Sequence, residues 1–214
     1  MTDKVNLDRA SLPDQIKEHL LEQITSGVLK PGDRLIELKI AGDMDTSQAP
    51  VREALRELEA IGIVETRRNK GARVRIMSDS ELRDIYDVRA ELEGYGAEIA
   101  ARNGKHLEKP LSEMLARMDT AARTGDAIAF ATHNTAFHRI IVEASGNSVL
   151  LDHWERLDVQ FRTAINMARL DMDLAHAAAS HKPIIAAITA EDPVLSRRLA
   201  KTHVLDNKPG STNT

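Results

Sequence analysis

A short polar run leads directly into an amphipathic segment in DTSQAPVREALRELEAIGIVET, residues 45–66. Ser47, Gln48 and Arg52 crowd together at its start, where a buried enzyme helix would not need them. Pro50 fits the first turn of a helix, because a backbone N–H at that position has no helical partner to lose. Side chains and free N–H groups at a helix start can reach base edges and phosphates in the major groove. These residues predict a helix that inserts its N-terminal end into DNA.

The two arginines of this segment differ in their expected roles. Arg52, one turn after Ser47 and Gln48, can reach a phosphate or a guanine edge. Arg56 lies a further turn along, and pairing with a glutamate at helical spacing is an equally good interpretation of it. The same alternative is weaker for Arg52, because it leaves the proline-led helix start unexplained.

A basic strip, RRNKGARVR (Arg67–Arg75), carries five basic residues and no acidic one. Apolar and polar residues alternate on both sides of RNKG, which predicts a β-hairpin. Lys70 and Gly71 would form its tip, where glycine lets the backbone approach DNA closely and lysine touches a minor groove or a phosphate. The alternative is an ordinary solvated hairpin.

A second group of residues could bind a metal ion. Asn134 and His138 stand four residues apart and share a helical face with apolar neighbours. His181 and His203 also lie on apolar faces of predicted helices. Imidazole suits Zn, Ni, Fe or Cu, and inward histidines from three helices can converge in a bundle core. A single inward histidine is more often an ordinary core residue.

The elements that must position these residues form two regions. In the first, residues 9–76, we expect three helices followed by the hairpin: a helix from Ser11 to about Gly27, a short helix over 36–44, and a helix capped by Asp45 or Thr46 that ends near Gly62. This order defines a winged helix-turn-helix.

Residues 77–80 are expected to link this domain to an all-α bundle over 81–206. Ser80 would cap its first helix. Further helices are predicted over residues 109–124, 126–146, 148–170, 174–190 and 192–206. The polar tail 207–214 is expected to be disordered. The fold class is therefore mostly α, with a small β-hairpin wing.

Composition restricts the possible functions. Without cysteine, disulfides and thiolate metal sites are excluded. Residues 1–77 hold 13 of the 29 Lys+Arg and 13 of the 33 Asp+Glu, so this part is neutral and the net charge of −4 lies in the remainder. A neutral domain with one basic strip fits limited contact with phosphates. No apolar run approaches the roughly 20 residues that span a bilayer, and the start lacks a signal peptide. We therefore expect a cytoplasmic protein without a membrane partner.

The runs LKPGDRL, SQAPVREALRELEAIGIVE and RRNKGARV together resemble the DNA-binding domain of GntR-family regulators, over roughly residues 9–76. That family usually carries a Gly-Val-Ser-Arg-Thr-Pro-Val-Arg-Glu-Ala-Leu type of string. Here Asp45 replaces the usual Gly, Gln48 stands where Arg is common, and Gly42-Asp43 lies in a usually better helix. Glutamine pairs with adenine whereas arginine favours guanine, so Gln48 could alter the base preference.

The second region resembles the all-α effector domain, called FCD, of the FadR-type branch of this family. The similarity is carried by VRAELEGYGAEIAA, NTAFHRIIVEASGN, SHKPIIAAI and AKTHV, in that order over roughly residues 81–205. Many members of this branch bind a divalent metal through an Asp and three His, and some use the metal to hold a small carboxylic acid.

The resemblance implies a site for Zn, Ni or a similar ion at Asn134, His138, His181 and His203. Asn134 stands where Asp is usual and removes one negative charge. Binding is therefore expected to be weaker, or to be completed by water or by the effector.

A carboxylate effector would also need a cation. Arg89, in VRAELE, could point into the bundle, although an ion pair with Glu93 at i, i+4 is an equally good interpretation. Arg162 and Asn166, also at i, i+4, are weaker candidates for the same cavity.

The resemblance implies a ligand-responsive transcription regulator and not an enzyme. We expect a homodimer that binds a pseudopalindromic operator and represses genes for the metabolism of a small organic acid. Binding of the acid is expected to release the dimer from the operator or to change its orientation there. The alternative is a metal-dependent hydrolase or isomerase that uses the histidines and a bound water. The sequence has no His-Glu-x-x-His motif to support it, and it would leave the winged helix unexplained.

Overall fold

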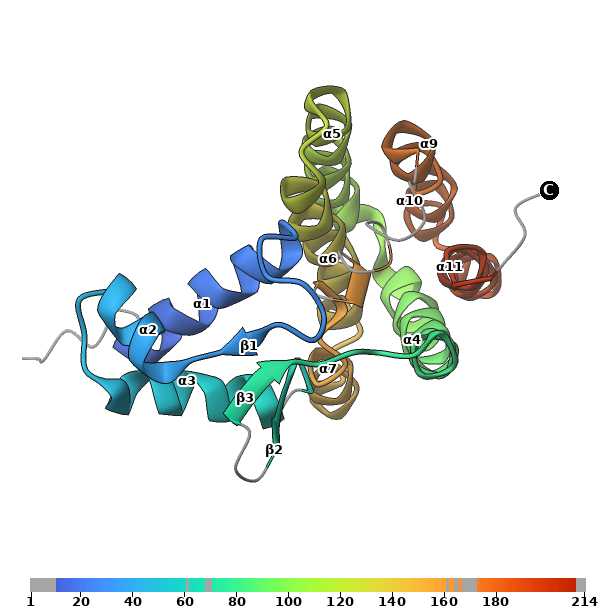
Figure 1. Ribbon diagram of the computed structural model, residues 1–214. Helices are drawn as coiled ribbons and strands as arrows, with labels where there is room; N and C mark the ends of the chain where they lie inside the picture. The colour runs from blue at the N-terminus through green and yellow to red at the C-terminus, as the bar shows by residue number, and fades with distance from the viewer. Residues whose placement is uncertain are drawn as a thin grey trace, which may run out of the picture. The chain divides into compact units, whose positions relative to one another are not determined.

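The computed structural model divides the chain into two compact units, Met1–Ile76 and Met77–Thr214 (Figure 1). It describes these parts of the chain: residues 11–60, 62–67, 71–160, 162–163, 166 and 173–210. The first unit combines helices with a small sheet, and the described part of the second is helical throughout. The expected fold class, mostly α with a winged helix and a helical bundle, is confirmed.

The first unit has the predicted order of three helices and a hairpin. Its elements are α1 (Leu12–Thr25), β1 (Arg34–Leu35), α2 (Glu37–Asp43), α3 (Gln48–Ala60), β2 (Val64–Arg67) and β3 (Gly71–Val74). Ser11 caps α1 as expected, through a reciprocal pair of hydrogen bonds with Asp14. Strand β3 lies between β2 and β1, antiparallel to both. The two-residue strand β1 was not predicted, because so short a strand carries no detectable alternation.

The turn before α3 differs from the prediction. The helix begins at Gln48, so a cap at Asp45 or Thr46 was placed too early. Asp45 instead has a left-handed backbone, with φ of 47°. Pro50 lies in the first turn as expected. The apolar face of α3, with Val51, Leu55 and Leu58, is buried and leaves the start of the helix exposed.

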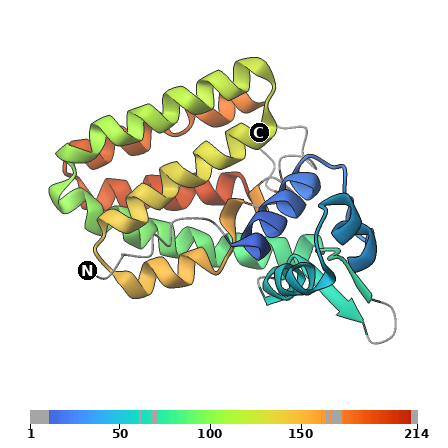
Figure 2. The same ribbon diagram turned by 90° about the vertical axis from the view of Figure 1, so that its left-hand side faces the viewer.

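The second unit is a bundle whose long helices run side by side (Figure 2). Its helices are α4 (Asp79–Ala100), α5 (Glu108–Thr124), α6 (Ala127–Ala144), α7 (Ser148–Glu155), α9 (Leu174–Ala179), α10 (Lys182–Thr189) and α11 (Pro193–Asp206), with short 3₁₀ turns at Ala101–Asn103 and Lys105–Leu107. Helix α4 packs along α11 and α6, while α5 packs on α6, α9 and α10. No helix in the described stretches is long and apolar enough to cross a membrane.

Three helix boundaries in this unit correct the sequence prediction. Ser78, not Ser80, caps α4, so the helix starts within the expected linker. The helix predicted over 148–170 is interrupted after α7, where Asp158 has a left-handed φ of 46°. The helix predicted over 174–190 is two helices, because Pro183 cannot donate a backbone hydrogen bond and clashes with the preceding turn. Pro183 lies in the first turn of α10 instead.

Candidate functional site

The start of α3 exposes the side chains expected to read DNA. Ser47 is exposed and Gln48 is partly exposed. The Nε atom of Arg52 lies 2.7 Å from Oε2 of Glu37 on α2, and its Nη2 donates to Oε1 of Gln48 at 3.2 Å. The structure therefore brings Gln48 and Arg52 together. It also shows a contact with Glu37, which the sequence pattern did not predict because Glu37 lies 15 residues earlier on another helix.

The ion pair between Arg52 and Glu37 orients the Arg52 side chain and contributes little to the stability of the fold. The two side chains are 54% and 37% exposed, and an ion pair this open to solvent contributes about 0–1 kcal/mol to stability. It holds the guanidinium on the exposed side of α3, next to Gln48.

Arg56 also projects into solvent from α3. Among the described residues it has no hydrogen-bonded or ion-paired partner. Of the two glutamates at helical spacing from Arg56, Glu53 and Glu59, the second accepts from the backbone N–H of Thr66 at 2.8 Å. Pairing along the helix surface therefore gains no support in the described part of the chain.

The wing is only partly available for phosphate contact. Gly71 is exposed with a left-handed φ of 75°, and Lys70 lies outside the described residues. Glu65 on β2 accepts contacts from Arg67 at 3.2 Å and from Arg73 at 3.1 Å. Two of the five basic residues of the strip are thus paired with a carboxylate in the described structure.

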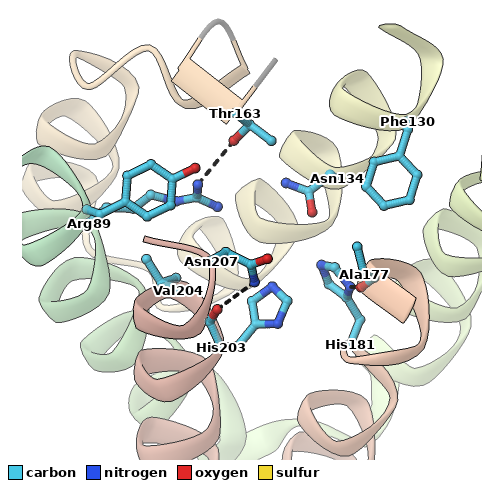
Figure 3. Close-up of a pocket in the computed structure, with 10 residues that line it drawn as sticks. Arg89, Phe130, Asn134, Thr163, Ala177, His181, His203, Val204 and Asn207 are labelled. Carbon is cyan, nitrogen blue, oxygen red and sulfur yellow. Dashed lines mark hydrogen bonds between the residues drawn. The ribbon is translucent and has the colours of Figure 1, made fainter. Parts of the chain in front are cut away.

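In the second unit, His138 on α6, His181 just before α10 and His203 on α11 converge. One nitrogen of each lies within 4.8 Å of the other two, and the exposed fractions are 1%, 1% and 9%. Asn134, one turn before His138, faces the same cavity as His181 and His203 (Figure 3).

The polar contacts of the three imidazoles indicate which nitrogen of each ring is available. Nδ1 of His138 lies 2.7 Å from Oε2 of Glu93. Nδ1 of His181 lies 2.9 Å from the carbonyl oxygen of Ala177, which can only accept. Nδ1 of His203 lies 3.1 Å from Oγ of Ser180, whose own proton goes to the Ala177 carbonyl at 2.7 Å. Each Nδ1 therefore carries a proton, and in the neutral form of each ring the lone pair is on Nε2.

This tautomer leaves Nε2 able to coordinate a metal ion. Nε2 of both His138 and His181 is buried without a hydrogen-bond partner in the described structure. Burial lowers the pKa of His181 to about 3, with a further contribution from nearby His138. Burial also holds the pKa of His203 well below its usual range. Three imidazoles, each with its Nδ1 against a polar partner and its Nε2 available, are a donor set that fits a divalent transition metal.

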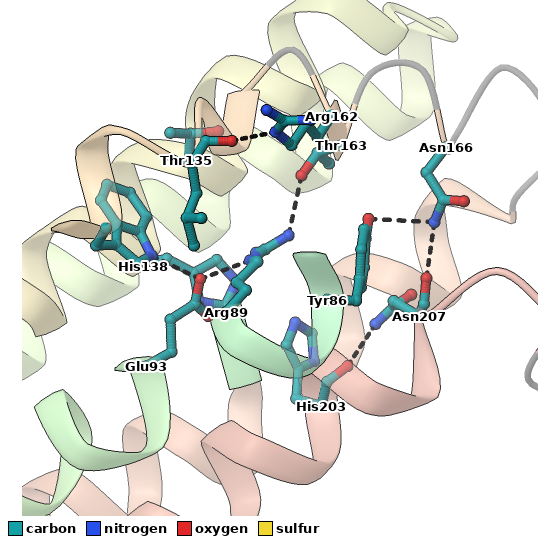
Figure 4. Close-up of polar contacts among 12 residues, drawn as sticks. Tyr86, Arg89, Glu93, Thr135, His138, Arg162, Thr163, Asn166, His203 and Asn207 are labelled. Atoms are coloured by element: carbon teal, nitrogen blue, oxygen red, sulfur yellow. Dashed lines mark hydrogen bonds and ion pairs between the residues drawn. The ribbon is translucent and has the colours of Figure 1, made fainter. Parts of the chain in front are cut away.

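Glu93 is the buried acid behind this cluster (Figure 4). Its Oε1 accepts from Nε of Arg89 at 2.6 Å and from Nε1 of Trp154 at 2.8 Å. Burial would raise the pKa of this carboxyl, but Arg89 and His138 outweigh that effect and lower it to about 2. Glu93 is therefore anionic, and its role toward the metal pocket is to orient His138.

The cavity is small and polar. Its volume is about 20 Å³, roughly the space that one water molecule needs. Its wall consists of Tyr86, Arg89, Phe130, Asn134, Thr163, Ala177, His181, His203, Val204 and Asn207. Sequence reasoning missed Tyr86, Thr163 and Asn207, since none of them belongs to a metal-ligand or cation pattern.

The three residues predicted to bind an acid occupy different positions. Arg89 lines the cavity, but it also forms the ion pair with Glu93, and its Nη1 donates to Thr163 at 3.1 Å. Arg162 is buried beside Met77, with Nη1 3.2 Å from the sulfur. Asn166 donates to the hydroxyl of Tyr86 at 3.1 Å. Arg162 and Asn166 lie beside the cavity and are not part of its wall.

A winged helix with an exposed reading helix, joined to a bundle with a buried histidine cluster, defines a class of DNA-binding regulator. Family comparison agrees with both halves. Residues 12–74 match the bacterial regulatory proteins of the gntR family, and residues 84–206 match the FCD domain. The chain belongs to the GntR family with an FCD effector domain. It is a DNA-binding transcription regulator and not an enzyme.

Individual relatives extend along most of the chain. A probable D-xylose utilization operon transcriptional repressor of Paenarthrobacter nicotinovorans is 37% identical, over 97% of this chain and 92% of its own length. The gluconate operon transcriptional repressor of Bacillus licheniformis is 34% identical over 71% of this chain and 62% of its own. The solved structure of E. coli McbR/YncC matches with a TM-score of 0.78 and 25% identity, over 93% of this chain and 96% of that one.

Proposed function

We propose that the protein is a homodimeric repressor that binds a pseudopalindromic operator and leaves it when a small organic acid enters the FCD cavity. The main observation in support is that Gln48 and Arg52 lie together and exposed at the start of α3, with Arg52 paired to Glu37. Ser47 and Gln48 would contact bases, Arg52 a guanine edge or phosphate, and Arg56, Lys70 and Gly71 the backbone.

The effector would be derived from a sugar. Two relatives are named as repressors of D-xylose utilization and gluconate operons, and gluconate is itself a hydroxy acid. The cavity wall carries hydroxyl and amide groups suited to such a molecule, in Tyr86, Thr163 and Asn207, and the cavity, about 20 Å³ in this structure, would have to widen to admit it. Arg89 also lines the cavity, where Glu93 balances its charge.

His138, His181 and His203 would hold a divalent transition metal through Nε2, with Asn134 on the same wall. The bound ion would supply a positive centre that attracts a carboxylate. Glu93, Ser180 and the Ala177 carbonyl orient the three rings, so substitution of Glu93 or Ser180 should weaken metal affinity although neither side chain contacts the ion.

The direct test is to incubate the purified protein with sheared genomic DNA from its source and sequence the recovered fragments. A shared palindrome upstream of a few genes supports the proposal, and those genes indicate the effector. Candidates such as D-gluconate and D-xylonate are then tested for release of that DNA, with and without added metal. Absence of any enriched motif under every condition refutes operator binding.

A further inference from the structure

The metal pocket lacks a negative charge of its own. An imidazole that binds a metal through Nε2 while Nδ1 keeps its proton is neutral, and Asn134 contributes a neutral amide. Asn134 is only 6% exposed, and its amide makes no hydrogen bond to any described residue. An amide without a protein partner among the described residues, on the wall of a cavity that His181 and His203 also line, points to a ligand in that cavity.

The buried acid next to the histidines, Glu93, already has two charged or polar partners. Glu93 is balanced by Arg89 at 2.6 Å, and its second oxygen lies against Nδ1 of His138 at 2.7 Å. Arg89 is the charged residue on the cavity wall. The pair is therefore neutral as a whole, and a divalent ion would place about two uncompensated positive charges in a buried space, which is strongly unfavourable.

We propose that Asn134 makes metal binding conditional on an anion, so that the ion and a carboxylate enter the cavity together. The carboxylate of the ligand supplies the charge that an aspartate at position 134 would supply. This inference rests on the proposed metal site and acid effector. Its functional consequence is a sensor that requires two inputs, because neither the metal alone nor the acid alone fills the pocket well.

Thermodynamic linkage makes the inference measurable from either side. If the acid tightens metal binding by some factor, the metal tightens acid binding by the same factor. A site with aspartate at position 134 would lose most of this coupling, because its own carboxylate already offsets part of the charge.

The experiment titrates the full-length protein with Co²⁺ at constant neutral pH, in a buffer of weakly coordinating anions, with and without excess acetate. The visible absorption of bound Co²⁺ and the heat of binding report occupancy and coordination directly. Acetate competes weakly for free Co²⁺, so any tightening by acetate cannot arise from that competition.

Asn134→Asp and Asn134→Ala form the matched pair of variants. For the wild type we expect acetate to lower the Co²⁺ Kd by about tenfold or more. Asn134→Asp should bind Co²⁺ without acetate and respond to it by less than about threefold. Asn134→Ala should keep the acetate dependence, since it restores no charge. Circular dichroism of each variant checks that the bundle is folded.

The possible outcomes distinguish failure of the anion dependence from failure of the proposed metal site. Tight Co²⁺ binding by the wild type without acetate, and no gain on adding it, overturns the conditional site while the metal site stands. Failure of both the wild type and folded Asn134→Asp to bind Co²⁺ under any condition overturns the metal site itself, and the inference with it.

Discussion

Arg52 carries its guanidinium at the exposed start of α3, where Glu37 and Gln48 hold it. Replacement by alanine should leave the fold intact, because the side chain is half exposed, and should nearly abolish operator binding. A base-reading arginine is worth about 1–3 kcal/mol at each half-site. Fluorescence anisotropy with operator DNA measures the loss. Arg56→Ala is the control and should cost less. Unchanged affinity of Arg52→Ala would refute its role.

We expect Glu37 to affect DNA binding through its contact with Arg52. Glu37→Gln removes the carboxylate 2.7 Å from Nε, so Arg52 becomes free to rotate while the protein loses one negative charge near the phosphates. We expect non-specific affinity to rise and discrimination between the operator and a mutated operator to fall. Competition binding at two salt concentrations gives both quantities.

Glu37→Asp is the matched control, because it keeps the charge but shortens the reach to Arg52. It should lose discrimination without the gain in non-specific affinity. If Glu37→Gln discriminates as well as the wild type, the ion pair has no part in sequence reading.

At the scale of elements, the turn between α2 and α3 sets how the reading helix starts. Asp45 adopts φ of 47° there, a conformation that glycine takes without strain and that Asn and Asp tolerate. Asp45→Gly and Asp45→Asn both remove an acidic group two residues before Ser47. Both should therefore bind DNA more tightly, with the gain shrinking at high salt.

The same two variants separate charge from backbone conformation. Both are neutral, so a difference in their stability reports the left-handed turn. We expect Asp45→Gly to be more stable than Asp45→Asn by up to about 1 kcal/mol in urea unfolding. Equal DNA affinity of both variants and the wild type would show that the carboxylate at position 45 is remote from the bound phosphates.

Helical periodicity predicted the elements well where burial is one-sided. Ile16, Leu20 and Ile24 repeat every four residues, and all three are buried in α1. The breaks were predicted less well. Pro183 lies inside a continuous apolar pattern that hid the separation of α9 from α10, and the turn at Asp158 has no glycine or proline to mark it.

The sequence predicted the three histidines of the candidate metal site. It did not predict the residues that orient their rings. His138, His181 and His203 each share a face with apolar residues, so their inward position follows from local pattern. Glu93, which orients His138, lies 45 residues earlier on a different helix. That contact depends on how α4 packs against α6, and local spacing carries no information about it.

At the scale of the whole molecule, the N-terminal unit has little electrostatic attraction to DNA by itself. Residues 1–77 carry equal numbers of basic and acidic side chains, and Arg67 and Arg73 are paired with Glu65. A single reading helix on such a unit gives weak binding. Tight binding then requires two linked copies, each on one half-site, since linkage can raise affinity by about 10²–10⁴ without new contacts.

A fragment of residues 1–76 tests whether tight DNA binding depends on linkage of two N-terminal units through the second unit. It should bind a single half-site weakly, with no response to metal or acid, provided that circular dichroism shows it to be folded. The full-length protein should bind the intact palindrome at least about a hundredfold more tightly. Scrambling one half-site should reduce the full-length protein to the affinity of the fragment. If the fragment matches the full-length protein on the palindrome, the second unit does not link two copies, and its cavity must act on DNA binding in another way.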